Sequence, residues 1–297
     1  MKIIFFGTPS IALPSLELLN SIPGTEILAV FTQPDRPVGR KKELTAPPVK
    51  ELAKELNLKV IQPQNKAELE EELSKFEADF FIVIAYGMIF SEKVLSMPKK
   101  AAINVHYSLL PKYRGASPVQ EAILNGDKET GIAFQKMAKK LDAGDLYLLE
   151  RMPIAKEDNT ESLMEKLAHK GAELLPFLLE DIFDNDLEPV AQNHKNATFC
   201  KKISKEDGKI DWKQSAEQIK NKMRAYAPWP GVFTEHNGKK LKIIEADLDE
   251  ETFEAGKFKL EEKILKIGTS HGSLIPKKVQ PEGKQAMEIS AFINGYL

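Results

Sequence analysis

The sequence predicts an α/β protein in which an open parallel sheet is followed by a smaller C-terminal β-barrel or sandwich. Three observations support this fold class. Short apolar runs alternate with amphipathic segments in the first half, several runs are apolar at successive positions, and short alternating segments between turns follow Cys200. Successive apolar positions suit strands that helices cover on both faces, whereas alternation between turns suits a small barrel or sandwich.

The elements of the first half follow from this alternation. The helical segments have apolar residues at helical spacing, and the last of them has Ser117 as an N-cap, Pro118 in its first turn and Gly126 as a stop. We expect strands at 3–6, 27–32, 59–61, 80–85, 102–105 and 132–137, and helices at 14–20, 49–57, 66–75 and 118–125.

The second half begins with leucines at helical spacing between Thr160 and Asp186, which predict one or two helices packed on the sheet. A polar stretch at 184–196 suits a linker. Beyond it we expect a helix at 215–226 and strands at 232–235, 241–245, 257–260 and 264–268. The chain is therefore expected to form a first domain at 1–186, a linker at 187–202 and a second domain at 203–297.

Composition excludes several classes of protein. Lys+Arg 42 against Asp+Glu 44 leaves a formal net charge of −2, so any contact with nucleic acid must come from a local basic patch. A single cysteine, Cys200, excludes an intramolecular disulfide and a cysteine-based zinc site, and we expect no metal. No apolar run approaches the length of a membrane span. We expect a cytoplasmic protein without membrane contact.

Two polar residues mark the end of the predicted strand near 105. Asn104 and His106 are two positions apart and therefore share one face of the strand, with Ile103 and Val105 on the other. An amide donor and an imidazole that converge at the carboxyl end of a strand can polarise a carbonyl and move a proton. The alternative is a hydrogen-bonded structural histidine.

A third polar group, Asp142, lies in a turn after the strand at 132–137. It could orient the imidazole of His106 and stabilise its protonated form, or it could simply form the turn. Its combination with Asn104 and His106 favours catalysis. Because no Ser or Cys accompanies the histidine in a G-x-S-x-G context, the sequence indicates direct transfer between two bound substrates rather than an acyl-enzyme.

These motifs resemble those of a known family. The segments N-x-H-x-SLLP-x-YRG at 104–115 and LD-x-GD at 141–145 are similar to the formyltransferases that use 10-formyltetrahydrofolate, whose catalytic trio is Asn, His and Asp. Within that family, TQPDRP-x-GRKK at 32–42, AYGMI at 85–89 and PWPG at 228–231 resemble the methionyl-tRNA formyltransferases. The resemblance covers nearly the whole chain and departs at 138–140, where the family usually has an acidic residue and a glycine.

The resemblance implies transfer of a formyl group from 10-formyltetrahydrofolate to the α-amino group of initiator methionyl-tRNA, for translation initiation. It implies Asn104, protonated His106 and Asp142 as the catalytic residues. It also implies a Rossmann-like formyltransferase domain followed by an OB-like β-barrel that engages tRNA. Two segments are further implied to border the folate. Their residues are Ser108, Leu109, Leu110 and Pro111, and Tyr86, Gly87, Met88 and Ile89.

A basic segment between two predicted elements of the first domain adds a tRNA contact to this interpretation. Its cations are Arg36, Arg40, Lys41 and Lys42, and its prolines and glycine make it a poor helix or strand. A solvated loop is the alternative. At the carboxyl edge of the sheet such cations can hold phosphates. In the second domain, a further basic face between 201 and 224 suits contact with the nucleic-acid backbone.

Two rival functions remain. A folate-dependent sugar-nucleotide N-formyltransferase shares the Asn-His-Asp trio but needs no basic tRNA loop. A tRNA-binding module without catalysis would not require the trio. Arg40, Lys41 and Lys42 favour the tRNA enzyme over the first rival, and the complete trio favours it over the second. We expect a monomer.

Overall fold

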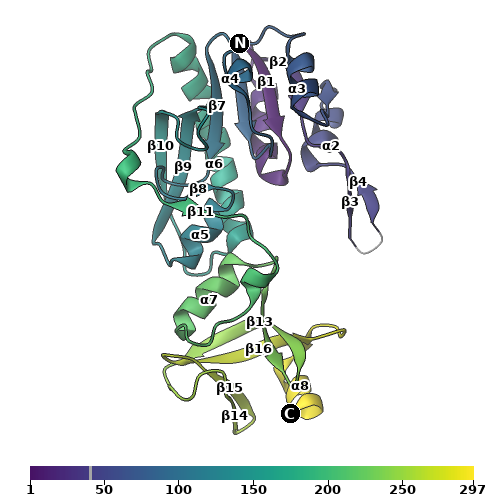
Figure 1. Ribbon diagram of the computed structural model, residues 1–297, viewed down its shortest axis with the longest axis vertical. Helices are drawn as coiled ribbons and strands as arrows, with labels where there is room; N and C mark the ends of the chain where they lie inside the picture. The colour runs from purple at the N-terminus through teal and green to yellow at the C-terminus, as the bar shows by residue number, and fades with distance from the viewer. Residues whose placement is uncertain (40–41) are drawn as a thin grey trace. The chain divides into compact units, whose positions relative to one another are not determined.

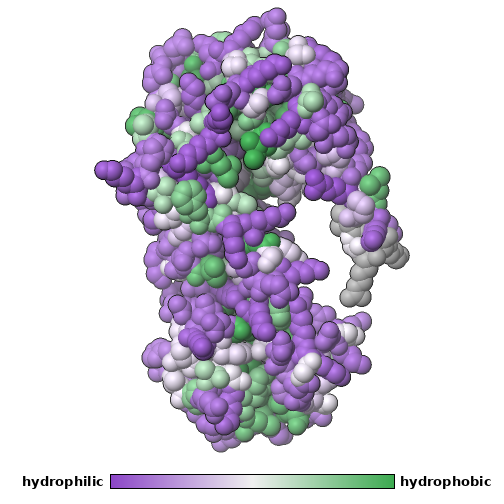
Figure 2. All heavy atoms as spheres, viewed as in Figure 1, coloured by the Kyte–Doolittle hydropathy of each residue, from purple (hydrophilic) through white to green (hydrophobic). Residues whose placement is uncertain are grey.

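The computed structural model describes residues 1–39 and 42–297 and divides into two compact units (Figure 1). The first unit comprises 1–115, 130–153 and 164–199, and the second comprises 116–129, 154–163 and 200–297. Charged and polar side chains cover most of the face drawn in Figure 2. Within the described residues, no helix has the length and apolar character needed to cross a membrane.

The first unit is built on a seven-stranded sheet in the order β10-β9-β7-β6-β1-β2-β5. β1, β2, β5, β6 and β7 run parallel, which confirms the predicted Rossmann-like α/β class. β9 runs antiparallel to β7, so the expected parallel sheet is mixed at this edge. The sequence did not reveal this direction, because a strand buried on both faces has the same apolar pattern either way. The strands are β1 Lys2–Gly7, β2 Glu26–Phe31, β5 Val60–Ile61, β6 Phe80–Ile84, β7 Ala101–His106, β9 Glu129–Lys136 and β10 Leu146–Pro153.

The predicted helices begin and end close to the expected positions, whereas α4 Glu92–Leu95 was not predicted. The helices are α1 Leu13–Ser21, α2 Pro48–Glu55, α3 Lys66–Leu73, α4 Glu92–Leu95, α5 Pro118–Leu124 and α6 Thr160–Phe183, with 3-10 turns at Ser10–Ala12, His194–Asn196 and Glu206–Gly208. α6 is one helix with Pro176 inside it, which resolves the choice between one and two helices. α3 begins at Asn65, whose side chain accepts a hydrogen bond from the Glu68 amide.

Aromatic packing around Phe6 of β1 organises the core of the first unit. The Phe6 ring centroid lies 5.1 Å from that of Phe31 and 5.3 Å from that of Phe81. It also lies 5.3 Å from the ring of Tyr86 and 4.9 Å from that of Phe90. Such edge and offset contacts favour one arrangement over others. The core therefore fixes the segment that follows β6 as well as the strands.

Helix α6 covers one face of β7 and β9. A Cβ added at Gly171 would lie 3.6 Å from Val105 and 3.7 Å from Ile132. Side chains alternate between the faces of a strand, so Val105 and Asn104 point to opposite sides. Asn104 and His106 therefore lie on the face away from α6.

The strand order reverses direction beside β1. From β1 the chain moves to β2 and β5 on one side, and then to β6 and β7 on the other. The turns that follow β1 and β6 are joined, because the Thr8 hydroxyl donates to the Tyr86 carbonyl at 3.1 Å. Ligands of open α/β sheets commonly bind outside the strand ends at such a switch point.

The basic segment forms a two-stranded hairpin, β3 Arg36–Val38 and β4 Glu43–Thr45, with Arg36 opposite Thr45. The expectation that this segment makes a poor strand is wrong for its first three residues. A proline is tolerated because each strand of an isolated pair has one free edge, where no ladder hydrogen bond is lost. Arg40 and Lys41 lie outside the described residues.

The second unit contains an antiparallel sheet in the order β12-β13-β16-β15-β14, with β17 beside β16. Its strands are β12 Val232–His236, β13 Lys239–Asp249, β14 Phe258–Glu261, β15 Ile264–Gly268, β16 Ser273–Pro281 and β17 Met287–Glu288. The predicted turn between β12 and β13 is present, with positive φ at Asn237 and Gly238 as a tight hairpin requires. β16, β17 and the last helix, α8 Ile289–Tyr296, were not predicted.

The packing of this unit depends on one apolar cluster and one capped helix. The buried members of the apolar cluster are Leu241, Leu265, Val279 and Phe292. Helix α7, Ala216–Ala225, begins with a capping box in which Ser215 and Gln218 satisfy each other's backbone amides.

The segment expected to be a linker is bound to the first unit. Val190 forms a bridge with Leu146, and Gln192 is only 6% exposed. Near its end lies the short strand β11 Phe199–Cys200, which pairs with the short strand β8 Arg114–Gly115. Most side chains of this segment are exposed, as its polar composition suggests, whereas Gln192 is buried and backbone carbonyls satisfy its amide.

Candidate active site

The register between β7 and β9 assembles polar side chains on one face of the sheet. Asn104 lies opposite Gln135, and His106 lies opposite Ala133. Residues directly opposite in an antiparallel pair share a face. Gln135, 2% exposed, therefore joins Asn104 and His106, although sequence reasoning did not select it. The sequence feature that could have indicated Gln135 is a single amide side chain within an apolar strand.

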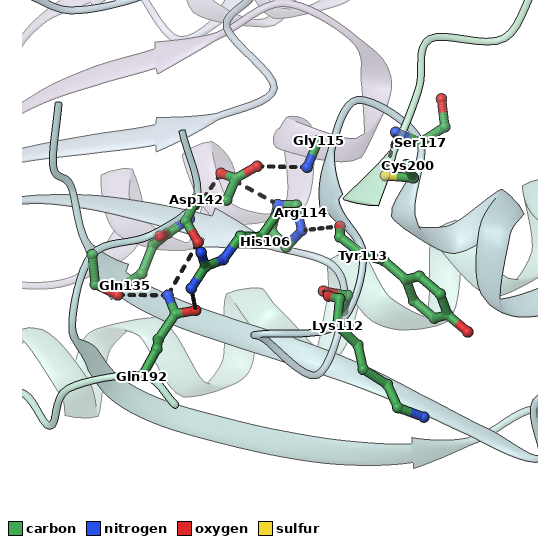
Figure 3. A network of polar contacts seen from close by, with 12 residues as sticks. His106, Lys112, Tyr113, Arg114, Gly115, Ser117, Gln135, Asp142, Gln192 and Cys200 are labelled. Carbon is green, nitrogen blue, oxygen red and sulfur yellow. Dashed lines mark hydrogen bonds and ion pairs between the residues drawn. The ribbon is translucent and has the colours of Figure 1, made fainter. Parts of the chain in front are cut away.

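Asp142 is fixed by two neutral donors, as Figure 3 shows. Its Oδ1 accepts a hydrogen bond from Gln135 Nε2 at 3.0 Å, and its Oδ2 accepts one from the Gly115 amide at 2.8 Å. The side chain is 8% exposed and the backbone has φ +48°. The turn thus projects the carboxylate towards β7 instead of solvent.

Both ring nitrogens of His106 face oxygen atoms. Nε2 lies 3.1 Å from the Tyr113 carbonyl oxygen, which can only accept, so Nε2 is the donor. Nδ1 lies 3.7 Å from Asp142 Oδ1, which is ion-pair range but longer than a hydrogen bond. A charged imidazole would present a hydrogen to each oxygen. The structure therefore brings the predicted His106 and Asp142 together.

The Asn104 amide lies on the same face of β7 as His106 and is the third member of the predicted catalytic group. The residue is half-buried, and its side chain forms no hydrogen bond within the described part of the chain. Its two donors are thus available to a ligand. An amide, an imidazole and a buried carboxylate in this order can stabilise a developing oxyanion and hold a proton.

Ser108 does not supply a nucleophile to this group. It is fully buried, and its hydroxyl donates to the Lys112 carbonyl at 2.6 Å, closing the turn after β7. A hydroxyl committed to the backbone in this way stabilises the turn. Direct transfer between bound substrates remains the chemistry that these residues suit.

The two predicted folate segments differ in what they expose. Tyr86 and Leu110 are buried, and burial raises the pKa of the Tyr86 hydroxyl above its usual value. Ile89 is 63% exposed, and Met88 is half-buried. The remaining members, Leu109, Pro111 and Gly87, are partly or fully exposed. The buried residues stabilise the two turns, whereas the exposed residues are accessible to a ligand.

The base of the β3–β4 hairpin is held by a polar cluster. Asp35 accepts hydrogen bonds from Gln62 at 2.8 Å and Lys50 at 2.7 Å, which hold its pKa below the usual value. Arg36 is exposed and donates to the Gln33 side chain at 3.1 Å. Lys42 is exposed with φ +52°. The two cations that can be described therefore lie at the surface.

Much of the predicted basic face in the second unit is committed to its own backbone. Lys220 and Lys222 donate to the carbonyls of Ala246 and Lys209, and Arg224 donates to three carbonyls between 155 and 158. The exposed lysines 202, 205 and 213 form no ion pair among the residues that the structure covers. Those three are the cations available to a partner.

A buried pair of side chains, Arg114 and Gln192, was also not identified from the sequence. Arg114, 2% exposed, donates to Gln192 Oε1 at 2.5 Å and lies 2.8 Å from His194 Nδ1. Arg114 belonged to a recognised motif without an assigned role, and Gln192 lay in the expected linker. In the described ranges, no three His, Cys, Asp or Glu side chains are grouped to hold a metal ion.

Comparisons with known proteins show the family and the fold of this chain. The family model "Formyl transferase" matches residues 1–179, and "Formyl transferase, C-terminal domain" matches 202–297. A solved N-formyltransferase from Helicobacter canadensis, in complex with folinic acid and dTDP-3-aminofucose, is 24% identical. It superposes with a TM-score of 0.70 and covers 95% of this chain and 99% of that one, a likeness that shows the fold.

Nearer relatives are proteins with the name methionyl-tRNA formyltransferase. The protein from Listeria innocua is 44% identical over 99% of this chain and 95% of its own length. The protein from Mesoplasma florum is 42% identical over 98% of this chain and 94% of its own length. With both family models matched in order, this chain belongs to the formyl transferase family.

Proposed function

We propose that this protein transfers the formyl group of 10-formyltetrahydrofolate to the α-amino group of initiator methionyl-tRNA. The main support is the match at 42–44% identity, over nearly the whole chain, to proteins with the name methionyl-tRNA formyltransferase. The grouping of Asn104, His106 and Asp142 supplies the chemistry that such a transfer needs. The product, formylmethionyl-tRNA, serves translation initiation.

We propose that the reaction uses these side chains. The amine nitrogen attacks the formyl carbon, a C–N bond forms, and the carbonyl oxygen becomes an oxyanion. Asn104 and protonated His106 stabilise that charge, while Asp142 supports the imidazolium. As the tetrahedral intermediate collapses, the bond to N10 of the folate breaks, and the proton lost by the amine is passed to that nitrogen.

The folate donor is proposed to lie against the two segments that follow β6 and β7. The fit rests on the Thr8–Tyr86 link at the switch point and on the partly exposed apolar side chains Leu109, Pro111, Met88 and Ile89. The end of a strand at a switch point is a common place for ligands, and partly exposed apolar side chains suit a flat, mostly aromatic ligand.

The division of labour along the chain is part of the proposal. Residues 1–186, with the segment 187–199 bound to them, would form the catalytic domain, and 203–297 the domain that engages tRNA. Arg36, Arg40, Lys41 and Lys42 would contact tRNA phosphates, and exposed lysines of the second unit would add backbone contacts. We propose that the protein acts as a monomer in the cytoplasm.

A sugar-nucleotide N-formyltransferase is the second candidate, because the solved Helicobacter canadensis enzyme shares the fold and holds dTDP-3-aminofucose. Its 24% identity is well below the 42–44% of the methionyl-tRNA formyltransferases. The test is transfer of labelled formyl from one donor to methionyl-tRNA or to amino-sugar nucleotides. We expect a large preference for methionyl-tRNA in kcat/KM. Preference for the sugar nucleotide would reject the proposal.

A further inference from the structure

We propose that Gln192 is a positioning residue that holds Asp142 in place for the transfer; this rests on the catalytic role proposed for Asp142. Gln192 comes from the segment after α6, about fifty positions further along the chain. Its Nε2 donates to the Asp142 carbonyl at 3.1 Å and to the Gly144 carbonyl at 2.6 Å (Figure 3). The Gln192 side chain thus forms two hydrogen bonds to the backbone of the turn that contains Asp142.

The turn needs such support because of its backbone conformation. Asp142 has φ +48°, in the left-handed region that side chains other than glycine disfavour. Two positions further on, a Cβ at Gly144 would lie 1.7 Å from the Lys136 carbonyl oxygen, so the turn presses directly on the end of β9. Contacts from outside the turn must therefore hold this conformation.

Arg114 fixes the other end of the same amide. Its Nη2 donates to Gln192 Oε1 at 2.5 Å, and both side chains are buried. The guanidinium can only donate, so the amide oxygen must face it and the NH₂ group must face the turn. A glutamate would have no donor for the two carbonyls, and an aliphatic residue would serve neither end.

The network closes on the carboxylate itself. Gly115, next to Arg114 in the chain, donates its amide to Asp142 Oδ2 at 2.8 Å. The Arg114–Gly115 strand therefore holds the carboxylate directly and the backbone of Asp142 through Gln192. Loss of Gln192 frees the backbone, which displaces the carboxylate from His106 although no atom of Gln192 touches the reacting groups.

The kinetic test uses Gln192→Ala and Gln192→Glu in the full chain, with Asn193→Ala as matched control. Asn193 is the exposed neighbour, and its side chain bonds only locally to the Lys195 amide. We expect kcat to fall by about 10- to 100-fold in both Gln192 variants with KM for either substrate nearly unchanged. We expect Asn193→Ala to keep parental kinetics. A fall in Asn193→Ala equal to that in Gln192→Ala would overturn the role.

A double-mutant cycle separates positioning from general damage. In an Asp142→Ala background, measured by single turnover, Gln192→Ala should lower the rate less than twofold further, because the group it positions is gone. An undiminished 10- to 100-fold loss in that background would mean that Gln192 acts without Asp142, and would overturn the proposal.

Amide hydrogen exchange tests the inference without any reaction. In Gln192→Ala the Gly115 amide should exchange at least tenfold faster, because its acceptor Asp142 Oδ2 is displaced, while amides of β6 keep their protection. Gly115 protected as in the parent would overturn the inference. If the parent formylates no methionyl-tRNA, the proposed function fails, and the exchange of Gly115 still decides the role of Gln192.

Discussion

The Nδ1 atom of His106 lies 3.7 Å from Oδ1 of Asp142, while that same oxygen accepts a hydrogen bond from Gln135 at 3.0 Å. The carboxylate is therefore held by a neutral amide rather than by the imidazole. It lies beside the ring without a hydrogen bond to it. A ring in this position can gain or share a proton as a substrate's charge develops.

Asp142→Asn is expected to lower kcat by two to four orders of magnitude, as replacing the carboxylate of a catalytic triad does. The amide retains the shape but removes the charge, and its NH₂ group faces a donor, Gln135 or Gly115, that the carboxylate accepted from. The measurement is kcat for methionyl-tRNA together with a thermal unfolding curve.

Asp145→Asn is the matched control, since Asp145 lies in the same turn with its side chain exposed. It should retain parental turnover. Near-parental turnover in Asp142→Asn would remove the carboxylate from the mechanism.

The rate of transfer is expected to be bell-shaped in pH. The attacking amine must be neutral, so the rate rises as pH rises on the acid side. The imidazole must be charged, so the rate falls when His106 loses its proton on the alkaline side. His106→Asn should be slower and should lose the alkaline fall. The profile of kcat/KM from pH 5 to 10 measures both limbs, and an unchanged alkaline limb in the variant would exclude this role for His106.

Asp207 should make the stability of the second unit depend on pH. Hydrogen bonds from Lys201 and Ser204 lower its pKa from 3.8 to about 2. A carboxyl with a lowered pKa in the folded state stabilises it above pH 3.8, and this contribution is lost as pH falls through about 2. Because the pair is near the surface, we expect less than about 1 kcal/mol.

Asp207→Asn tests this contribution in the full chain. Both tryptophans, Trp212 and Trp229, lie in the second unit, so their fluorescence follows its unfolding in urea. The variant should be less stable than the parent at pH 7, with the difference shrinking below pH 4. Glu206→Gln, an exposed neighbour, should track the parent. A parent–variant difference that is constant from pH 7 to pH 2.5 would contradict the assignment.

The sequence allowed the parallel strands and the pair Asn104 and His106 to be predicted, because burial and a period of two are local properties. Gln135 was missed because a polar residue in an apolar strand does not reveal which residue it faces. Gln192 was missed because its partners are backbone carbonyls about fifty positions away, which no pattern of side chains encodes. The β3–β4 hairpin was missed because proline in a strand is normally an argument against that strand.

The last prediction concerns the cations of the β3–β4 segment. Arg40→Ala, Lys41→Ala and Lys42→Ala combined should raise KM for methionyl-tRNA by an amount equivalent to roughly one to a few kcal/mol if these side chains bind phosphates. The KM for the folate donor should change little. The matched control replaces Lys2, Lys59 and Lys99 by Ala, which removes the same charge from exposed positions at the amino ends of β1, β5 and β7, where no tRNA contact is proposed.

Salt dependence decides between phosphate binding and mere solubility. Each phosphate contact releases counterions, so log kcat/KM for tRNA falls linearly with log salt, and each lost contact makes that slope shallower by about one. The variant of the β3–β4 segment should therefore differ most from the parent at low salt and converge with it at high salt. A solvated segment would leave the tRNA kinetics parental at both ionic strengths, since isolated exposed charges contribute little. That result would reject the phosphate contact and leave acceptor choice to be explained by other residues.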